Sequence, residues 1–203
     1  MQNLIELKEV GKSFYKAKKL SFRLKNINLK VTESQLIIVK GPNGSGKTTL
    51  LKILKKISLP DHGKIIFSSE INEKDISLQA SNENTFFPRL TARENLEFFL
   101  GMKGYSLEES YKLFGAFCLS KDILNSRFFN LSLGEKKKLS LIRAFIGQPK
   151  IILLDEPTVS LDIPSRAGLI RIIKSYRELG TIFIVATHEH DLFEGAENSV
   201  IEL

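Results

Sequence analysis

Hydrophobic residues alternate with polar ones in the N-terminal part of the chain. The alternation covers Leu4 to Lys8 and returns from Phe22 to Val31, with a break in phase near Asn26. A period of two residues is typical of a strand that buries one face. We therefore expect these segments to form half-buried antiparallel strands.

Three later hydrophobic segments show no alternation. They are short continuous runs at Leu36 to Val39, Ile151 to Leu154 and Ile182 to Ala186. The strands of a parallel sheet are covered by helices on both faces, and they lose the alternation for that reason. The pattern predicts an α/β fold with a parallel sheet at its centre.

Helical spacing dominates from about residue 89 to residue 148. The helix-capping pattern Ser/Thr-x-x-Glu recurs there at Thr91 to Glu94, Ser106 to Glu109 and Ser132 to Glu135. We expect a single domain over residues 1–203. Residues 1–88 and 149–203 would form its α/β core, with the alternating N-terminal strands as an antiparallel β subdomain, and residues 89–148 would form an inserted helical subdomain.

Composition limits the class of protein. The chain has 203 residues, of which 42% are hydrophobic and 26% are charged. No hydrophobic run approaches the roughly 18 to 20 residues of a membrane-spanning helix, and the first residues do not resemble a secretory signal. A cytoplasmic location is therefore expected. The single cysteine, Cys118, has no partner for an internal disulfide, and we expect it to be buried as a small apolar residue.

The net charge of +7 is spread along the chain, and only Lys136 to Lys138 form a short basic run. Such a run could suit nucleic acid, an acidic lipid or an acidic protein surface. It is more often a solvated helix face, and we interpret it so. No direct nucleic-acid partner is expected.

Residues 41–49 read Gly-Pro-Asn-Gly-Ser-Gly-Lys-Thr-Thr, which matches the phosphate-loop pattern G-x-x-x-x-G-K-[ST]. A predicted buried strand precedes the match and helical spacing follows it. Glycines let backbone amides curl around phosphate oxygens, and the helix N-terminus adds positive potential. Lys47 would reach the β and γ phosphates of ATP, and the Thr48 hydroxyl would bind Mg²⁺. The residues predicted to surround the nucleotide here are Gly41, Asn43, Gly44, Gly46, Lys47, Thr48 and Thr49.

A second chemical feature is the strand-like run that starts at Ile151 and ends in Asp155 and Glu156. The carboxyl end of a parallel strand faces the crevice in which α/β sheets bind their ligands. Asp155 is predicted to hold Mg²⁺, directly or through water. Glu156 is predicted to polarise the attacking water as a general base.

The segment Leu131-Ser132-Leu133-Gly134-Glu135 resembles the signature of ABC ATPases, usually Leu-Ser-Gly-Gly-Gln. The order of phosphate loop, signature, Asp-Glu strand, Ser160-Leu161-Asp162 and His188 is also that family's order, so the resemblance spans nearly the whole chain. It implies a phosphate-loop NTPase that hydrolyses ATP with Mg²⁺. It further implies that His188 hydrogen-bonds the γ phosphate and that Asp162 belongs to the nucleotide site. Phe14 lies 27 residues before Gly41, where the family places the aromatic residue that stacks on adenine.

Ser132 at a helix N-cap, with Gly134 close by, presents a hydroxyl and amides at a positive helix end, which is an anion site. Within one subunit this site has no phosphate to meet. The family implies a head-to-tail dimer, formed by two copies or by a related ABC subunit, which clamps ATP between the phosphate loop of one and the signature of the other. It also implies transmembrane partner subunits, which would hold the chain on the inner face of the membrane.

Two departures from the family pattern affect the site. A Gln that contacts Mg²⁺ and the attacking water normally precedes the segment that Phe87 to Thr91 resembles. Asn82 falls in that position, whereas Gln79 comes three residues early. Leu133 and Glu135 also replace the usual Gly and Gln of the signature. We expect slower hydrolysis or looser coupling, and not an inactive site.

Two other functions remain as alternatives to a transporter motor. A non-transport ABC ATPase, in chromosome maintenance or translation, would carry long coiled-coil arms or two ATPase copies. Here 84 residues lie between Lys47 and Ser132 and each motif occurs once, which disfavours both arrangements. Another phosphate-loop enzyme, such as a small-molecule kinase, would leave Ser132 to Glu135 and His188 unexplained. Among transporters, the short segment after His188 resembles small exporter subunits such as the haem-exporting ATPase of cytochrome c maturation.

Overall fold

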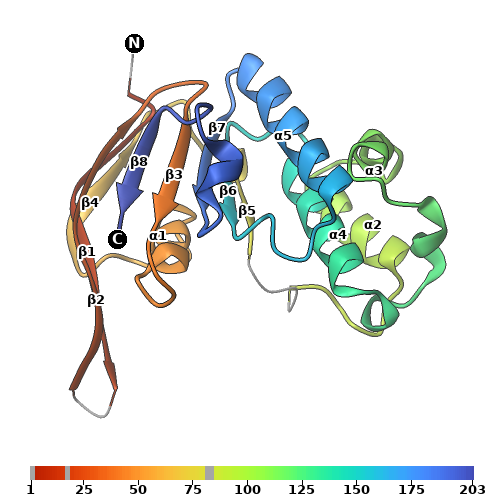
Figure 1. Cartoon of the computed structure of the whole chain (residues 1–203), viewed down its shortest axis with the longest axis horizontal. Coiled ribbons are helices and arrows are strands. Elements are labelled where there is room, and N and C mark those ends of the chain that lie inside the picture. The colour runs from red at the N-terminus through yellow and green to blue at the C-terminus, as the bar shows by residue number, and fades with distance from the viewer. Residues whose placement is uncertain (1–2, 17–18, 81–84) are drawn as a thin grey trace.

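The computed structural model describes residues 3–16, 19–80 and 85–203. An antiparallel sheet has the strand order β2-β1-β4, with β1 at Ile5–Lys16, β2 at Lys19–Val31 and β4 at His62–Phe67. The predicted N-terminal strands are confirmed. The break in phase is a β-bulge, because the register shifts between Val10 and Lys12 of β1, opposite an Asn26 with a left-handed φ of 44°. Beyond β4, the strands β1 and β2 continue as a two-stranded ribbon (Figure 1).

A second sheet contains parallel strands in the order β5-β6-β7-β3-β8. The three continuous hydrophobic runs form its interior, and each is buried, which confirms the predicted α/β core. The strands are β3 at Leu36–Lys40, β5 at Ile76–Gln79, β6 at Ile151–Asp155, β7 at Ile182–Ala186 and β8 at Ser199–Glu202.

The parallel sheet separates two hydrophobic cores. Ile37, Leu153 and Ile184 pack with α1 (Lys47–Leu54) and the antiparallel sheet. Ile152 and Val185 point to the opposite face, where the remaining helices pack. These helices are α2 at Ala92–Gly101, α3 at Tyr111–Ala116, α4 at Leu133–Phe145 and α5 at Ile163–Glu178 (Figure 1). Short 3₁₀ turns lie at Glu73–Asp75, Glu108–Ser110, Lys121–Asn125, Phe128–Asn130 and His190–Phe193. The parallel sheet thus has α1 and the antiparallel sheet on one face and the other α-helices on the opposite face.

The predicted caps define two of the helices. Thr91 begins α2 and Ser132 begins α4, each with a reciprocal capping box. The third pattern does not start an α-helix. The Ser106 N–H donates to the Glu109 carboxylate at 2.6 Å, but the chain forms only a 3₁₀ turn there.

Two minor sequence expectations are wrong. Cys118 is exposed, because the chain reverses direction directly after α3 and Cys118 adopts a φ of 50° in that turn. Lys137 and Lys138 are buried, with 2% and 7% of their surface exposed, because α4 packs between the end of β6 and the start of α5. Two of the three lysines of the basic run are therefore part of the interior.

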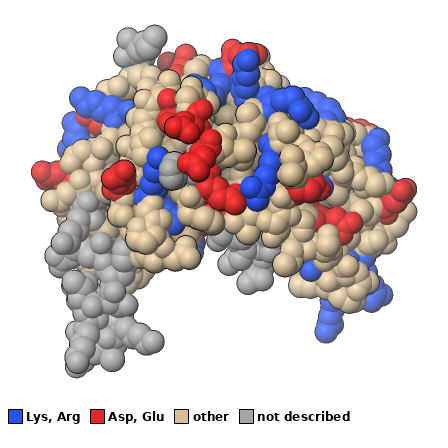
Figure 2. All heavy atoms as spheres, viewed as in Figure 1, with Lys and Arg blue, Asp and Glu red and all other residues tan. Residues whose placement is uncertain are grey.

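Within the described ranges, none of the helices combines the length and the apolar character that a membrane span requires. On the face shown in Figure 2, acidic and basic side chains are interspersed, and a run of acidic side chains crosses the middle.

Candidate functional site

One cleft of about 430 Å³ brings most of the predicted site residues together. It lies at the carboxyl end of β6, between the start of α1 and the strand β1. Its lining consists of Phe14, Asn43, Gly44, Gly46, Lys47, Thr48, Thr49, Asp155 and Glu156. Sequence segments more than a hundred residues apart therefore form one concave surface.

The glycines of the loop before α1 are required by its backbone. Gly46, the N-cap of α1, has a φ of 103°, a conformation that other residues adopt only with strain. At Gly41, a Cβ would lie 2.4 Å from the Ser45 Oγ and 2.8 Å from the Leu203 carbonyl oxygen. No side chain caps the first turn of α1, so its amides remain donors for an anion.

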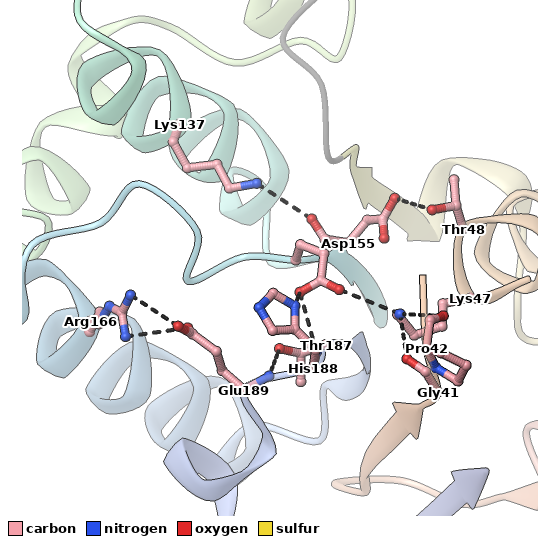
Figure 3. Close-up of polar contacts among 11 residues, drawn as sticks. Gly41, Pro42, Lys47, Thr48, Lys137, Asp155, Arg166, Thr187, His188 and Glu189 are labelled. Atoms are coloured by element: carbon pink, nitrogen blue, oxygen red, sulfur yellow. Dashed lines mark hydrogen bonds and ion pairs between the residues drawn. The ribbon is translucent and has the colours of Figure 1, made fainter. Parts of the chain in front are cut away.

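Lys47 occupies the centre of the cleft with only 6% of its surface exposed. Its Nζ donates to the carbonyl oxygens of Gly41 at 2.7 Å and Pro42 at 3.3 Å, and it lies 3.6 Å from Glu156 Oε1 (Figure 3). A buried ammonium group needs such partners. Because these partners converge on the loop, the charge is held where phosphate oxygens would enter.

Thr48 and Asp155 meet at the junction of α1 and β6. The Thr48 hydroxyl donates to Asp155 Oδ2 at 2.8 Å (Figure 3). Both groups are hard oxygen donors, which Mg²⁺ prefers. Among the described residues, no group of three or more His, Cys, Asp or Glu side chains could hold a metal. The pair therefore fits an ion that takes its other ligands from water and phosphate, as Mg²⁺ commonly does.

Glu156 extends from a strained backbone. It has a left-handed φ of 47°, which costs a non-glycine residue about 1 to 3 kcal/mol. Its N–H donates to the Ala186 carbonyl at 2.8 Å, so β7 holds this conformation. Oε2 of Glu156 lies 2.9 Å from His188 Nδ1 and accepts a longer bond of 3.4 Å from the His188 N–H. The carboxylate is thus fixed at the cleft by His188, which follows β7.

The segment that carries His188 is anchored on both sides. Thr187 is fully buried, and its Oγ1 accepts a bond of 3.0 Å from the Glu189 N–H. Glu189 pairs with Arg166 of α5 at 3.2 Å (Figure 3). Hydrogen bonding from Thr158, together with Arg166 and His188, lowers the pKa of Glu189. His188 therefore projects from a fixed turn, with about half of its side chain exposed.

Phe14 forms a separate wall of the cleft, with 40% of its surface exposed. An exposed aromatic ring at this position suits stacking against a purine. Lys12 Nζ lies 5.6 Å from the ring centroid and also pairs with Asp61 at 3.2 Å. The pKa of Asp61 is lowered by hydrogen bonds from the Ser13 N–H and from Lys12. These contacts attach the Phe14 segment to the chain that follows α1.

The signature residues lie outside this cleft. Neither Ser132 nor Gly134 occurs among the described residues that line it. Ser132 Oγ accepts from the Glu135 N–H at 3.2 Å, and the Glu135 carboxylate accepts from the Ser132 N–H at 2.8 Å. A Cβ on Gly134 would come within 2.9 Å of the Ser160 carbonyl oxygen, so glycine permits α4 to lie against the segment that leads into α5. The neighbouring Leu133 is 65% exposed.

Asp162 caps α5 and binds α4. Its Oδ1 accepts from the Ser165 N–H at 2.9 Å, and its Oδ2 accepts from Lys138 Nζ at 2.8 Å. Hydrogen bonds from Lys138 and Ser165 lower the pKa of Asp162 to about 2. Within one chain Asp162 thus joins two helices, and its contact with a nucleotide stays a prediction.

The metal contact predicted for Asn82 lies outside the described residues. Gln79 is the last residue of β5 and pairs with Leu154, the residue before Asp155. Gln79 is fully buried, its Nε2 donates to the Ala80 carbonyl, and its Oε1 has no hydrogen-bond partner among the described residues. By register, Gln79 therefore lies at the end of the strand next to the one that ends in Asp155. The strand-like segment Ile76–Gln79 ends at this glutamine, and that ending is the sequence signal that could have identified it.

Sequence reasoning also missed a contact from α4 to the site. The Nζ of the buried Lys137 donates to the Asp155 backbone carbonyl at 3.4 Å (Figure 3). Lys137 lies in the basic run, and a run of like charges along the sequence does not show which lysine contacts the Asp155 carbonyl.

Comparison with known proteins gives concordant results. A family model described as ABC transporter matches residues 24–159. The uncharacterized ABC transporter ATP-binding protein MJ1508 of Methanocaldococcus jannaschii is 33% identical over 97% of this chain and 94% of its own length. The zinc import ATP-binding protein ZnuC of Wigglesworthia glossinidia brevipalpis is 30% identical over 99% of this chain and 83% of its own length.

Solved structures agree with this result. The ATP-binding cassette MJ0796 of M. jannaschii, in a dimeric post-hydrolysis state bound to ADP and Pi, superposes with a TM-score of 0.81. It is 28% identical to this chain, and the match covers 93% of this chain and 89% of that one. The α/β fold with an antiparallel N-terminal sheet and a parallel sheet is therefore that of known cassettes.

Proposed function

The chain belongs to the ABC transporter family as an ATP-binding cassette with ATPase activity, and we propose that a second cassette completes its catalytic cleft by pairing head-to-tail. The observation that carries this proposal is the position of Ser132 and Gly134. They form an anion site at the start of α4, but they do not line the cleft formed by the described residues of the same chain. A second cassette would supply the missing half.

The start of α4 is suited to bind phosphate oxygens. The capping box satisfies the Glu135 N–H and leaves the first-turn amides of Leu133 and Gly134 without an acceptor inside the helix. The helix dipole adds positive potential at the same end. Because Gly134 has no side chain, a phosphate could approach these amides closely.

The cleft residues then have distinct roles in hydrolysis. Lys47 would neutralise the phosphate oxygens of ATP, and Phe14 would stack on the adenine. Thr48 and Asp155 would hold Mg²⁺, which neutralises phosphate charge when bound. Glu156 would accept a proton from the attacking water, and His188 would orient Glu156 while hydrogen-bonding the γ phosphate. Positioning and charge neutralisation are the main contributions expected for phosphoryl transfer to water.

The proposal extends to the membrane. Relatives are named as an ABC transporter ATP-binding protein and a zinc import ATP-binding protein, which supports a transport motor over a non-transport ABC ATPase. We infer that separate transmembrane subunits bind this chain and hold it on the cytoplasmic face of the membrane. Closure of the paired cassettes on ATP would then move those subunits, and hydrolysis would reset them.

The test uses the purified chain in size-exclusion chromatography with light scattering. Glu156→Gln is expected to elute as a dimer in ATP and Mg²⁺ and as a monomer without nucleotide. The double variant Glu156→Gln with Ser132→Arg should bind ATP but stay monomeric. The arginine side chain would fill the space at the start of α4 that the partner's phosphate needs. A dimer that survives Ser132→Arg would overturn the head-to-tail arrangement.

A further inference from the structure

The aromatic wall of the nucleotide cleft lies where β1 extends past the end of β4. Among the described pairs, the last one between β1 and β4 joins Gly11 to His62. The strand β1 then continues beside β2 to Lys16 (Figure 1), and Phe14 lies in that continuation. A two-stranded ribbon is only marginally stable in water. The Phe14 ring can therefore keep a fixed position only with support from outside the ribbon.

Asp61 provides such support from the segment that connects α1 to β4. Its Oδ2 accepts from the Ser13 N–H at 2.7 Å, and its Oδ1 accepts from Lys12 Nζ at 3.2 Å. The Asp61 N–H donates to the Gly11 carbonyl at 2.8 Å. Asp61 directly precedes the first residue of β4, so its carboxylate serves as the acceptor that a longer β4 would supply to β1.

Lys12 connects the aromatic ring to the same segment. Its Nζ donates to the Leu59 carbonyl at 2.7 Å and lies 5.6 Å from the centroid of the Phe14 ring. A cation within about 6 Å of a ring centroid is attracted by the ring quadrupole. Only 17% of the Lys12 side chain is exposed, so its ammonium group interacts with these partners more strongly than it would in open solvent. The ring, the lysine and Asp61 thus form one connected set of contacts.

The junction between β1 and β4 is closely packed. A Cβ on Gly11 would lie 2.1 Å from His62 Nε2, so a larger residue would force the two strands apart. The pKa of Asp61 is lowered by the hydrogen bond from the Ser13 N–H and, next, by Lys12. Asp61 is therefore a carboxylate at neutral pH, the form that accepts from both donors.

The segment that carries Asp61 is also attached to the helix that follows the phosphate loop. The N–H groups of Ile57 and Ser58 donate to the Lys52 carbonyl in the last turn of α1, at 2.9 Å and 3.2 Å. The first turn of the same helix contributes amides to the cleft. A chain of direct contacts therefore leads from the phosphate site through α1 and Asp61 to Phe14.

We propose that Asp61 is a positioning residue that holds the Phe14 ring at the separation from the phosphate loop that a nucleoside triphosphate spans. This inference rests on the proposed stacking of adenine on Phe14 and identifies the group that fixes the stacking ring. Asp61 does not line the cleft formed by the described residues, and it acts through Ser13 and Lys12. Its loss would weaken the contribution of the base and leave phosphate binding intact.

The first experiment compares two ligands of the full chain in the presence of Mg²⁺. Calorimetry measures the affinity for ATP and for inorganic tripolyphosphate, which has no base. Phe14→Ala should weaken ATP binding at least about fivefold, the usual loss when a side chain that stacks on a base is removed. Asp61→Ala should weaken ATP binding about threefold, as expected for the loss of hydrogen bonds. Neither variant should change the affinity for tripolyphosphate.

Two further variants distinguish positioning from general destabilisation. Asp61→Asn should lose less ATP affinity than Asp61→Ala, because its amide oxygen can still accept from the Ser13 N–H. Asp75→Ala is the matched control, since Asp75 Oδ2 accepts from the Asn72 N–H at 2.8 Å in a turn that does not line the described cleft. The control should bind both ligands like the parent chain. An equal loss of ATP and tripolyphosphate affinity in Asp61→Ala would overturn the proposal.

A double-variant cycle tests whether Asp61 acts through the ring. Adding Asp61→Ala to Phe14→Ala should cause no further loss of ATP affinity, because the ring that Asp61 positions is already absent. Losses that add in the double variant would show that Asp61 acts independently of Phe14, and they would contradict the inference.

The second experiment measures the mobility of the wall directly. The chain contains no tryptophan, so Phe14→Trp introduces a single indole fluorophore. Without nucleotide, adding Asp61→Ala should lower the fluorescence anisotropy of this indole, whereas adding Asp75→Ala should not. An anisotropy that is the same with and without Asp61 would refute a positioning role.

The outcomes separate this inference from the proposed function. Reduced ATP affinity in Phe14→Ala together with normal affinity in Asp61→Ala overturns the inference alone and leaves adenine stacking in place. Normal ATP affinity in Phe14→Ala overturns the proposed stacking and, with it, this inference.

Discussion

His188 Nδ1 lies 2.9 Å from Glu156 Oε2, while the other oxygen of the same carboxylate lies 3.6 Å from Lys47 Nζ. The residue assigned as the base thus lies between the lysine assigned to the phosphates and the histidine assigned to the γ phosphate. Both neighbours acquire a stronger anionic partner once a triphosphate enters. Nucleotide binding would therefore loosen both contacts and free Glu156 to accept a proton.

Glu156→Gln should reduce the rate of ATP hydrolysis about 10²- to 10⁴-fold, the usual contribution of a general base. The amide keeps the shape of the side chain, so binding of ATP should be retained. Phosphate release and equilibrium binding of a fluorescent ATP analogue measure the two effects. A variant that hydrolyses ATP at the parent rate would show that another group is the base.

Lys47→Ala should instead weaken ATP binding. Hydrogen bonds to charged groups contribute about 1.5 to 3 kcal/mol, so the dissociation constant should rise at least about tenfold. Calorimetric titration of the folded variant with ATP and Mg²⁺ measures the change. Lys52→Ala is the control, because Lys52 is exposed on the same helix and should bind ATP normally. Equal affinities for both variants would contradict the role of Lys47.

Gly134→Ala should abolish most hydrolysis while ATP still binds to the single chain. The added Cβ would lie 2.9 Å from the Ser160 carbonyl oxygen, so α4 must shift at the end that meets the partner's phosphates. Gly115→Ala is the matched control, since a Cβ there meets nothing within 4 Å. The control should keep full activity. Normal hydrolysis by Gly134→Ala would exclude a close approach of the partner's phosphates to Gly134.

Asp162→Ala should lower the free energy of unfolding by about 1 kcal/mol at pH 7, because α5 loses its N-cap. The pKa of Asp162 is depressed to about 2 in the folded chain, so its stabilising effect is present above the unfolded pKa and is lost as the pH falls through the folded one. The difference between parent and variant should therefore be constant from pH 7 to about pH 5 and shrink from about pH 4 towards pH 2. Urea unfolding at several pH values tests this. A difference that grows on acidification would contradict the assignment.

Gln79→Ala should reduce Mg²⁺-dependent hydrolysis more than Asn82→Ala does. Gln79 ends β5 and pairs with the residue before Asp155, whereas Asn82 is three residues further along the chain. Hydrolysis rates over a range of Mg²⁺ concentrations compare the two variants. A larger loss in Asn82→Ala would favour the position deduced from the Phe87 to Thr91 segment.

The parts that sequence predicted well depend on short contiguous patterns. The phosphate loop and the Asp155–Glu156 strand end each lie within a few residues. Short continuous hydrophobic runs identified β3, β6 and β7 without information on distant contacts. The wrong expectations depend on packing between remote segments. Lys138 is buried because Asp162 comes to it from another helix, and charge pattern along α4 contains no sign of that partner.

The position of the metal-site amide stays a prediction, because two ways of finding it give different residues. Counting back from the Phe87 segment assumes a fixed loop length and gives Asn82. The strand register does not depend on loop length and brings Gln79 next to the Asp155 strand.

In a head-to-tail dimer, Lys137 would couple the two nucleotide clefts, a property that a single cassette lacks. Lys137 lies on α4, whose first turn would bind the triphosphate of the second cassette. Its ammonium group donates to the backbone carbonyl of Asp155 in the cleft of the same chain. Two such cassettes would be linked in both directions through this buried contact. Occupancy of one cleft would then be transmitted to the other, and turnover should rise with ATP concentration along a sigmoidal curve instead of a hyperbola.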